Sequence, residues 1–514
     1  MEELSGGRIT SVLPAIVVLI PFLSAVIAFF LTRFNRRAGE IFTVSSIAVV
    51  FAAIFSMYST VTAGYVIYGR YAFLSLPFTV SVRFDALSFF LAMIISFLWL
   101  LAALHSIGYM EKEHAHDRYY GLLLICMGGC LGTVVTGDLI GLFLFFEIMA
   151  LASFALVAHE EHPYAMFASV KYLFMSVGAG LAIFFGIVIT YFIGGSVSLS
   201  EFGLISEVST LSFIAFISFV LGFGIKAGIF PVHVWLPDAH PAAPAPVSAL
   251  LSGVMIKVGA YGLLRVFYQV FGFEFLQALG WEKITLILAV ITILLGSALA
   301  LIQDDIKRRL AYSSVAQIGY ILLGISMLSE RALTGGVYHI FTHAFMKGGL
   351  FLIAGAIILR TGERRISHMG GIGFKMPLTM IAFTLCSLSM VGIPPFNGFV
   401  SKWQLALGAL DIGQPMIVVL LIVSSLLNAA YYFPIVIAAF FAAPKEEGLE
   451  AGTVSGAHQP ESSGSVRTRM AEAPLNMLIP IGILAIGSIA FVLMPQNWPL
   501  EMAQAVVREL FVKF

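Results

Sequence analysis

The chain has 514 residues, of which 60% are hydrophobic and only 11% are charged, and its mean hydropathy is +0.98. Soluble domains carry about 25% charged residues, so this composition excludes a soluble protein and indicates a polytopic protein in a lipid bilayer. The formal net charge is zero, which excludes the basic surface that a nucleic-acid partner requires.

The three cysteines, Cys126, Cys130 and Cys386, all lie in apolar runs. Cys126 and Cys130 share a helix face, but two soft ligands without partners make a poor metal site, so we interpret all three as buried packing residues. The chain also lacks a CxxC pair, a haem motif, a Walker loop and a dinucleotide fingerprint. We therefore expect no metal, no cofactor and no catalytic redox centre in this chain.

Apolar runs of spanning length predict an all-α polytopic membrane protein with about 14 transmembrane helices, two of them broken. The first run, 11–31, is followed by Arg33, Arg36 and Arg37, which is typical of a retained helix and not of a cleaved signal peptide. The predicted helices cover residues 11–32, 40–63, 85–108, 120–137, 138–158, 167–193, 209–230, 244–270, 283–302, 308–329, 334–360, 377–411, 414–443 and 473–494.

Positive charge predicts the orientation of these helices. With the first loop inside, 15 of the 28 lysines and arginines fall in inside loops, 7 fall outside, and six lie within helices. Because cytoplasmic loops are enriched in lysine and arginine, this bias predicts that both termini lie outside. The stretch 444–472 is rich in glycine, serine and glutamate, which predicts a flexible inside loop.

Two helices contain breaks. The run 209–230 ends at Pro231, before a loop with five prolines, and the run 377–411 is interrupted by Gly392–Pro395. In lipid, a break survives only where it is buried in protein or lines a hydrated cavity. Paired interrupted helices point to a transport path between two inverted repeats of five helices. The predicted division is 1–119 for the first three helices, 120–270 and 283–443 for the repeats, 444–472 for the loop, and 473–514 for the last helix and a short C-terminal tail.

Four lysines stand in or beside the middle of apolar helices, at Lys226, Lys257, Lys347 and Lys402. A cation at mid-membrane costs a few kcal/mol or more, so such side chains face a bundle interior or water. Glu147 is the one clear acid within a helix, and Asp138 stands at the start of the same helix. Desolvation and mutual repulsion therefore make neutral lysine accessible, and a lysine poised between two forms can pass a proton. The other two intrahelical bases, Lys171 and Arg265, lie near helix ends and are expected to snorkel.

Histidines accompany these lysines. His339, His343 and Lys347 stand at positions i, i+4 and i+8 of one helix, so they share one face. This pattern suits a proton relay, and the alternative is a packing face with hydrogen-bonded histidines. No acid joins the stripe, which disfavours a metal site. His233 and His240, in the proline-rich loop, either cap the inside mouth of the path or solvate the loop.

Four motifs resemble a known family. Residues 233–264 read HVWLPDAHPAAPAPVSALLSGVMIKVGAYGLL, 342–351 read THAFMKGGLF, 392–403 read GIPPFNGFVSKW, and Glu147 lies in mid-helix. Together they resemble the antiporter-like membrane subunits of respiratory complex I, membrane-bound [NiFe] hydrogenases and Mrp-type Na⁺/H⁺ antiporters. The wording of the first motif is most similar to the hydrogenase type. The likeness covers the predicted helices 3 to 13, in the family's order.

The resemblance implies roles for individual residues. Glu147 matches the family's glutamate of helix 5, Lys226 its lysine partner, Lys257 the connecting lysine of helix 8, His343 the histidine of helix 11, and Lys402 the lysine of broken helix 12. In that family, half-channels from each side meet along a polar axis at mid-membrane. Some members carry glutamate where this chain has Lys402. One class of complex I subunit has a long lateral helix after the last span, and we expect none here.

The leading hypothesis is a proton-translocating subunit of a complex I-related redox complex, of the membrane-bound hydrogenase or ferredoxin-driven type, in the plasma membrane of a prokaryote. The resemblance implies partner membrane subunits, including small antiporter-type subunits, and a redox arm that carries the NiFe and iron–sulfur clusters. The lysine-rich path favours H⁺, because Na⁺ needs several oxygen ligands, and Na⁺ would pass through partners. The alternative is a subunit of an Mrp-type antiporter without a redox partner. A solute transporter or a structural scaffold fits the buried titratable bases less well.

Overall fold

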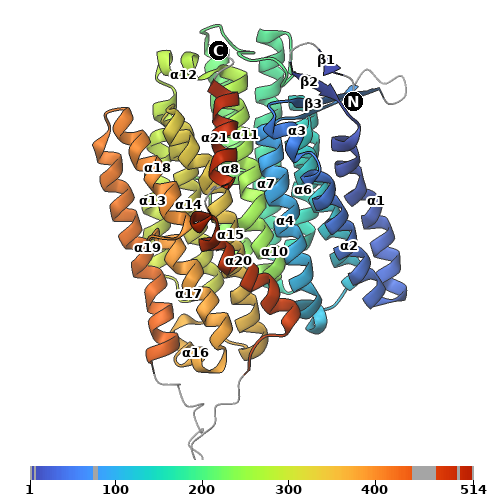
Figure 1. The fold of residues 1–514 in the computed structure, drawn as a ribbon, viewed down its shortest axis with the longest axis vertical. Helices are drawn as coiled ribbons and strands as arrows, with labels where there is room; N and C mark the ends of the chain where they lie inside the picture. The colour runs from blue at the N-terminus through green and yellow to red at the C-terminus, as the bar shows by residue number, and fades with distance from the viewer. Residues whose placement is uncertain (1–2, 5–6, 73–78, 443–470, 495–497, 512–514) are drawn as a thin grey trace, which may run out of the picture.

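The structure is a computed structural model that describes residues 3–4, 7–72, 79–442, 471–494 and 498–511. Its helices form one bundle, with both termini at the same end (Figure 1). Within the described residues, 12 helices are long and apolar enough to cross a membrane. The prediction of an all-α polytopic membrane protein is therefore confirmed.

Eleven of these spans are single helices apart from short extensions. They are α1 (Leu13–Phe34), α2 (Arg36–Phe55), α4 (Ala86–Tyr109), α5 (His116–Val135), α6 (Leu139–Val157), α7 (Pro163–Gly194), α8 (Thr210–Ala227), α13 (Glu282–Leu301), α15 (Glu330–Thr361), α19 (Pro415–Phe441) and α20 (Leu475–Leu493). The twelfth is built from α10 (Ala245–Leu250), the π-helical turn η2 (Leu251–Met255), α11 (Ile256–Arg265) and a second π-helical turn, η3 (Val266–Phe271).

Three further helices lie in the bundle, namely α14 (Ile306–Ser326), α17 (Pro377–Val391) and α18 (Asn397–Asp411). They occupy the predicted spans 308–329 and 377–411, so the count of 14 stays a prediction. The remaining short helices are α3 (Tyr58–Thr62), η1 (Met110–Lys112), α9 (Leu236–Ala242), α12 (Phe273–Leu279), η4 (Ile366–His368), α16 (Ile372–Lys375) and α21 (Trp498–Phe511). The predicted loop 444–472 lies outside the described residues except for Ala471 and Glu472.

Polar residues at the predicted boundaries start several helices. The side chains of Asp85, Asp138 and Asp305 each accept a hydrogen bond from a backbone N–H in the first turn of α4, α6 and α14, respectively. Ser209 and Ser212 form a reciprocal capping box at the start of α8. These bonds satisfy backbone donors that have no partner within the helix.

The two breaks have the same local design. α8 ends at Gly228 and α17 ends at Gly392, with φ angles of +80° and +86°. A left-handed residue of this kind ends a helix, and glycine adopts it without the steric cost that a Cβ imposes. The chain then turns through prolines into α9 and α18, respectively. The inverted repeats and their boundaries remain predictions.

A small sheet lies on one side of the end of the bundle where the termini lie, near α1 and α3 (Figure 1). It contains β1 (Glu3–Leu4), β2 (Arg8–Thr10), β3 (Val66–Ala72) and β4 (Thr79–Phe84), in that order. β2 and β3 are parallel, and the other two pairs are antiparallel. The sequence does not predict this sheet, because its longest strands have only six or seven residues between two strong helical signals.

A buried charge cluster joins this end of the bundle to α21. Arg265 is 1% exposed and holds both oxygens of Asp85 at 2.7 and 2.8 Å, so the prediction that it snorkels is wrong. Arg83 also contacts Asp85, at 2.8 Å, and Glu509 of α21, at 3.2 Å. By contrast, Lys171 keeps 31% of its side chain exposed while it pairs with Asp238 at 2.7 Å. The ion pair between Arg83 and Glu509 thus accompanies the packing of α21 against α15 and α4.

This cluster predicts a large stability effect at Asp85. Asp85→Ala leaves the buried Arg265 without an acid partner among the described residues, leaves Arg83 with Glu509 alone and removes the cap of α4, and breaking a buried ion pair in this way costs about 3–5 kcal/mol. We expect a clearly lower thermal unfolding temperature for the purified chain in detergent. Asp411→Ala is the control, because its pair with Arg331 is exposed and contributes little. Equal unfolding temperatures for both variants would contradict this account.

Candidate functional site

Glu147 and Lys226 lie near each other at the level of the first break. Lys226 is 1% exposed on the last turn of α8, and its amine donates a short hydrogen bond to the Tyr172 hydroxyl. That hydroxyl lies 2.6 Å from Ser153 Oγ. The Lys226 amine also lies 5.0 and 5.7 Å from the ring centres of Tyr172 and Phe146, whose faces stabilise a cation. The pair expected from the resemblance is therefore not a direct ion pair here, although the Lys226 charge acts on Glu147.

Glu147 occupies a place that a glycine leaves open. A Cβ on Gly180 of α7 would overlap Glu147 Oε1, so only glycine admits the carboxylate at this position. Oε1 is buried and has no hydrogen-bond partner among the described residues. An unpaired buried acceptor is costly, and such groups cluster at functional sites. The missing side chain of Gly180 thus leaves room for the carboxylate, and we call this space the Glu147 cradle. No hydrogen bond within the described residues holds Oε1 in place.

The amine of Lys402 lies against the C-terminal end of α17, where the second broken helix is interrupted. Its amine donates to the carbonyls of Met390 and Val391, at 3.1 and 2.9 Å, and to Ser425 Oγ at 3.0 Å. The two carbonyls belong to the last turn of α17, where the break removes their helical partners. The negative end of a helix dipole stabilises a cation at such a position.

Lys347 lies on the central helix α15 and is completely buried. Its amine donates to Ser313 Oγ at 2.6 Å, to the Tyr432 hydroxyl at 2.8 Å and to the Leu310 carbonyl at 3.2 Å. Ser313 and Tyr432 are themselves hydrogen-bonded, at 2.7 Å. All three donor positions of a protonated amine are therefore satisfied without an acid.

Hydrogen bonds connect Lys347 to Lys402. The Tyr431 hydroxyl lies 3.3 Å from Ser313 Oγ and donates to Asn428 Oδ1. Asn428 Nδ2 donates at 3.2 Å to the Met390 carbonyl, which also accepts from Lys402. A continuous polar chain thus runs between the two lysines through the interior of the bundle, and we call it the Ser313–Asn428 link.

The histidines of α15 lie on the same side of that helix as Lys347. His339 contacts Ser401 Oγ with Nδ1, at 2.9 Å, and Gln317 Oε1 with Nε2, at 3.0 Å. His343 stacks on His339 with ring centres 6.0 Å apart, and neither of its ring nitrogens has a partner among the described residues. Of these two histidines, His343 is therefore the one whose ring nitrogens make no hydrogen bond within the described residues.

Lys257 follows the π-helical turn η2, and its amine turns back to the Ser252 carbonyl. Turns of this type are frequent at functional sites. His240 of α9 is fully buried and stacks on Phe351, with ring centres 4.5 Å apart. Lys257, Lys347 and Lys307 all lie close enough for their charges to act on His240. His240 is thus placed between the central lysines and the end of the bundle opposite to the termini.

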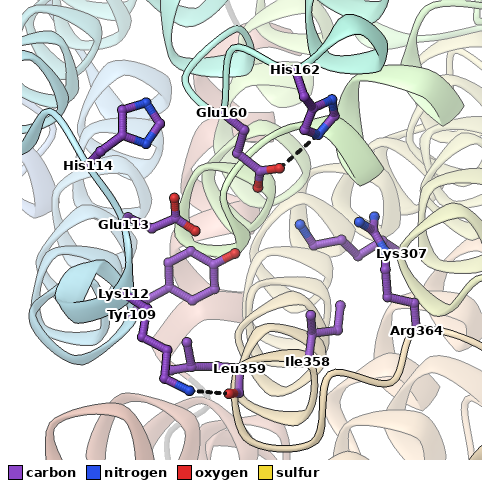
Figure 2. Close-up of a pocket in the computed structure, with 10 residues that line it drawn as sticks. All are labelled: Tyr109, Lys112, Glu113, His114, Glu160, His162, Lys307, Ile358, Leu359 and Arg364. Atoms are coloured by element: carbon purple, nitrogen blue, oxygen red, sulfur yellow. Dashed lines mark hydrogen bonds and ion pairs between the residues drawn. The ribbon is translucent and has the colours of Figure 1, made fainter.

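That end contains a cavity of about 440 Å³ (Figure 2). Tyr109, Glu113, Glu160, Lys307 and Arg364 are among its lining residues. Lys307 is 3% exposed, and its amine donates at 2.7 Å to a backbone carbonyl beside α9, that of residue 243. Burial and the charge of Glu160 raise the pKa of Glu113, so this carboxyl holds a proton to a higher pH than an exposed one. Lys307 thus lies between this cavity and the segment that carries His240.

Two of the predicted candidates lie apart from this row. Asp138 caps α6 through Gly141 N–H at 2.7 Å and accepts from Ser81, so the structure places it at the opposite end from the cavity. His233 lies at the first break, where its ring faces Tyr312 with centres 6.5 Å apart. Among the described residues, no hydrogen bond joins Lys226 to Lys257, although Gly259 brings the backbones of α11 and α8 into contact.

The sequence reasoning missed the hydroxyl and amide groups that connect the bases. The signal was present on α19, where Ser424, Asn428 and Tyr431 recur at helical spacing in an apolar run and are all buried. On α14, Ser313, Gln317 and Tyr320 do the same. Polar stripes within apolar helices thus carry the same information as isolated charges.

The comparisons with known proteins agree with this architecture. Residues 136–428, more than half of the chain, match the transmembrane family described as NADH:quinone oxidoreductase/Mrp antiporter, and residues 72–120 match the N-terminal region of chain 5 of NADH-ubiquinone oxidoreductase (complex I). NADH-quinone oxidoreductase subunit N of Desulforudis audaxviator is 36% identical over 93% of this chain and 95% of its own length. An Na⁺/H⁺ antiporter subunit of Alkalihalophilus pseudofirmus is 31% identical over 76% of this chain and 79% of its own length.

Hydrogenase-4 component B of Escherichia coli is 34% identical over 63% of this chain and 50% of its own length. A chain in the structure of the Mrp complex from Dietzia superposes with a TM-score of 0.85 at 25% identity, covering 98% of both chains. A chain of an archaeal membrane-bound sulfane sulfur reductase has the same fold, with a TM-score of 0.86 at 24% identity over 97% of this chain and 98% of its own.

Fold and comparisons thus define an antiporter-like membrane subunit, of the kind found in multisubunit membrane complexes. The chain belongs to the NADH:quinone oxidoreductase/Mrp antiporter family.

Gly180 provides a test of the Glu147 cradle. Gly180→Ala places a methyl group where Glu147 Oε1 lies, so we expect the flexible carboxylate to move and ion transport to fall several-fold with little loss of stability. The measurements are ion uptake into proteoliposomes and thermal unfolding. Gly178→Ala, on the same helix, is the control, because a Cβ there meets nothing within 4 Å. Unchanged transport in both variants would reject the cradle.

The Ser313–Asn428 link predicts an effect of one hydroxyl. Tyr431→Phe removes the hydrogen bond to Asn428 while it keeps the ring, and a hydrogen bond contributes roughly 0.5–1.5 kcal/mol. Because the change also removes a hydroxyl that can pass a proton, we expect transport to fall by at least about tenfold. Tyr268→Phe is the matched control, since this equally buried hydroxyl donates to the Ile325 carbonyl, away from the link. A similar loss in both variants would indicate a general packing effect.

Proposed function

We propose that this subunit moves protons through the membrane along the row of Glu147, Lys226, Lys257, His343, Lys347 and Lys402. The observation that carries the proposal is the Ser313–Asn428 link, which joins two buried amines that have no acid partner among the described residues. A chain of this kind has no evident value for packing, because buried amines are costly to desolvate. It suits groups that must gain and lose a proton.

The chemical role of each residue in the row follows from its contacts. Lys402 is stabilised as a cation by the last carbonyls of α17, and Lys226 by two aromatic faces. The hydroxyls of Ser313 and Tyr431 can accept and donate a proton, whereas Asn428 only fixes the geometry. The step from Tyr431 to Lys402 therefore requires a water molecule to carry the proton past Asn428. The cavity lined by Glu113 and Lys307 serves as the inside mouth, with His240 behind it.

We place the subunit in a complex I-related redox complex of the membrane-bound hydrogenase or ferredoxin-driven type, in a prokaryotic plasma membrane with both termini outside. Its relatives include a NADH-quinone oxidoreductase subunit and a hydrogenase component, which supports a redox-driven complex. In this proposal, partner subunits carry the NiFe and iron–sulfur clusters, and small antiporter-type subunits complete the membrane arm. H⁺ is the transported ion because Glu147 is the one acid in the row, and Na⁺ would need several oxygen ligands.

The second candidate function is that of an Mrp-type Na⁺/H⁺ antiporter subunit. The likeness to the Na⁺/H⁺ antiporter subunit of Alkalihalophilus pseudofirmus and to a chain of the Mrp complex favours it. The same row of bases would then exchange ions without a redox partner.

The proposed path predicts that Glu147→Gln and Lys402→Ala each reduce proton pumping to a small fraction while assembly is retained. The measurement is acidification in proteoliposomes that hold the complex purified through this chain. Glu501→Gln and Lys375→Ala are the controls, since both side chains are exposed and lie outside the row. Normal pumping by Glu147→Gln and Lys402→Ala would reject the path.

Metal and peptide analysis of the same purified complex distinguishes the two functions. Nickel, iron–sulfur clusters and a hydrogenase-type large subunit support the redox complex. Their absence, together with Mrp-type small subunits, supports the antiporter.

A further inference from the structure

Three side chains from two loops converge beside the cavity. Glu113 and His114 follow η1, and His159 follows α6. Each offers one ligand atom, and these atoms all lie within 4.8 Å of one another. Glu113 and His114 stand on the same side of the cavity (Figure 2), and the His114 and His159 rings stack with centres 5.1 Å apart.

His159 is the unusual member of this cluster. It is 1% exposed, and neither ring nitrogen makes a well-formed hydrogen bond within the described residues. Buried polar groups almost always have partners, so an imidazole without one requires an explanation. Both ring nitrogens of His159 are therefore available to bind a metal ion.

We infer that Glu113, His114 and His159 form a binding site for a divalent transition-metal ion of the Zn²⁺ type. Two imidazoles and one carboxylate are a common ligand set for Zn²⁺, with a fourth position left for water. Bonds of about 2.0–2.2 Å require the ligand atoms to come closer together than they now lie. Glu113 and His114 can make this movement, because they are only partly buried or exposed.

The charges around the cluster are mixed. The Glu161 carboxylate lies 3.9 Å from His114 Nε2, but it is paired with Arg118. Arg118 also donates at 3.2 Å to the His159 carbonyl, so it holds the loop in place while its charge opposes a cation. Removing Arg118 would release Glu161 as a fourth ligand. The positive charge of Arg118 therefore limits the affinity of the site for a cation.

The inference is independent of the proposed function, and it departs from our expectation of no metal in this chain. The sequence hides the site, because its ligands come from positions 113, 114 and 159 and form no local motif. Since Glu113 and His114 line the cavity that reaches Lys307, a bound ion would sit at its rim.

The test is a titration of the full-length chain in detergent with Zn²⁺, and with Co²⁺ as a spectroscopic probe. We expect one ion per chain and a visible Co²⁺ spectrum typical of tetrahedral coordination. His159→Ala and Glu113→Gln each weaken binding by at least about tenfold, and Arg118→Gln strengthens it. His368→Ala is the matched control, because this histidine pairs with Glu363 on another loop.

An unchanged dissociation constant in His159→Ala and Glu113→Gln, or an equal loss in His368→Ala, would overturn the site. If His159→Ala does not fold, as judged by size-exclusion chromatography, the exposed-side variants Glu113→Gln and His114→Ala decide the question. Failure of this test leaves the proton path untouched, because none of the three residues belongs to the row of bases.

Discussion

The cost of placing an amine away from water governs the interior of this protein. Within the described part of the chain, the buried lysines of the row are compensated in several ways, and none of them forms an ion pair. Lys226 lies against two aromatic faces, Lys347 donates to hydroxyls and a carbonyl, and Lys402 uses the carbonyls freed by a helix break. These contacts stabilise the protonated amine less than a neighbouring carboxylate would. The amines are therefore held in place without being locked in the charged state.

The two helix breaks matter for the same reason. A continuous helix satisfies its own carbonyls, whereas α17 stops at Gly392 and leaves two of them for Lys402. Arg265 shows the contrasting solution, since it is fixed by both oxygens of Asp85 and serves stability. Buried bases of the same bundle thus divide into those that are paired with an acid and those that are not.

Much of the fold could be predicted from the sequence, because long apolar runs and proline-containing breaks are local signals. The mid-membrane bases were found for the same reason, since a lysine in an apolar run is conspicuous. The link between Lys347 and Lys402 could not be predicted, because Ser313, Tyr431 and Asn428 come from two helices whose relative rotation is a tertiary property. The same limit explains the error at Arg265, because its partner Asp85 lies 180 residues away, at the start of another predicted helix.

The ion pair between Arg83 and Glu509 has a consequence for the biogenesis of the protein. The two residues are 426 positions apart, yet Glu509 contacts both the Arg83 guanidinium and the N-terminus of α4. During biogenesis, this corner of the bundle cannot close before residue 509 has been synthesised and has left the ribosome. A chain that stops before residue 509 therefore retains Asp85 as the acid beside Arg83 but lacks the contact that Glu509 makes with the first residue of α4.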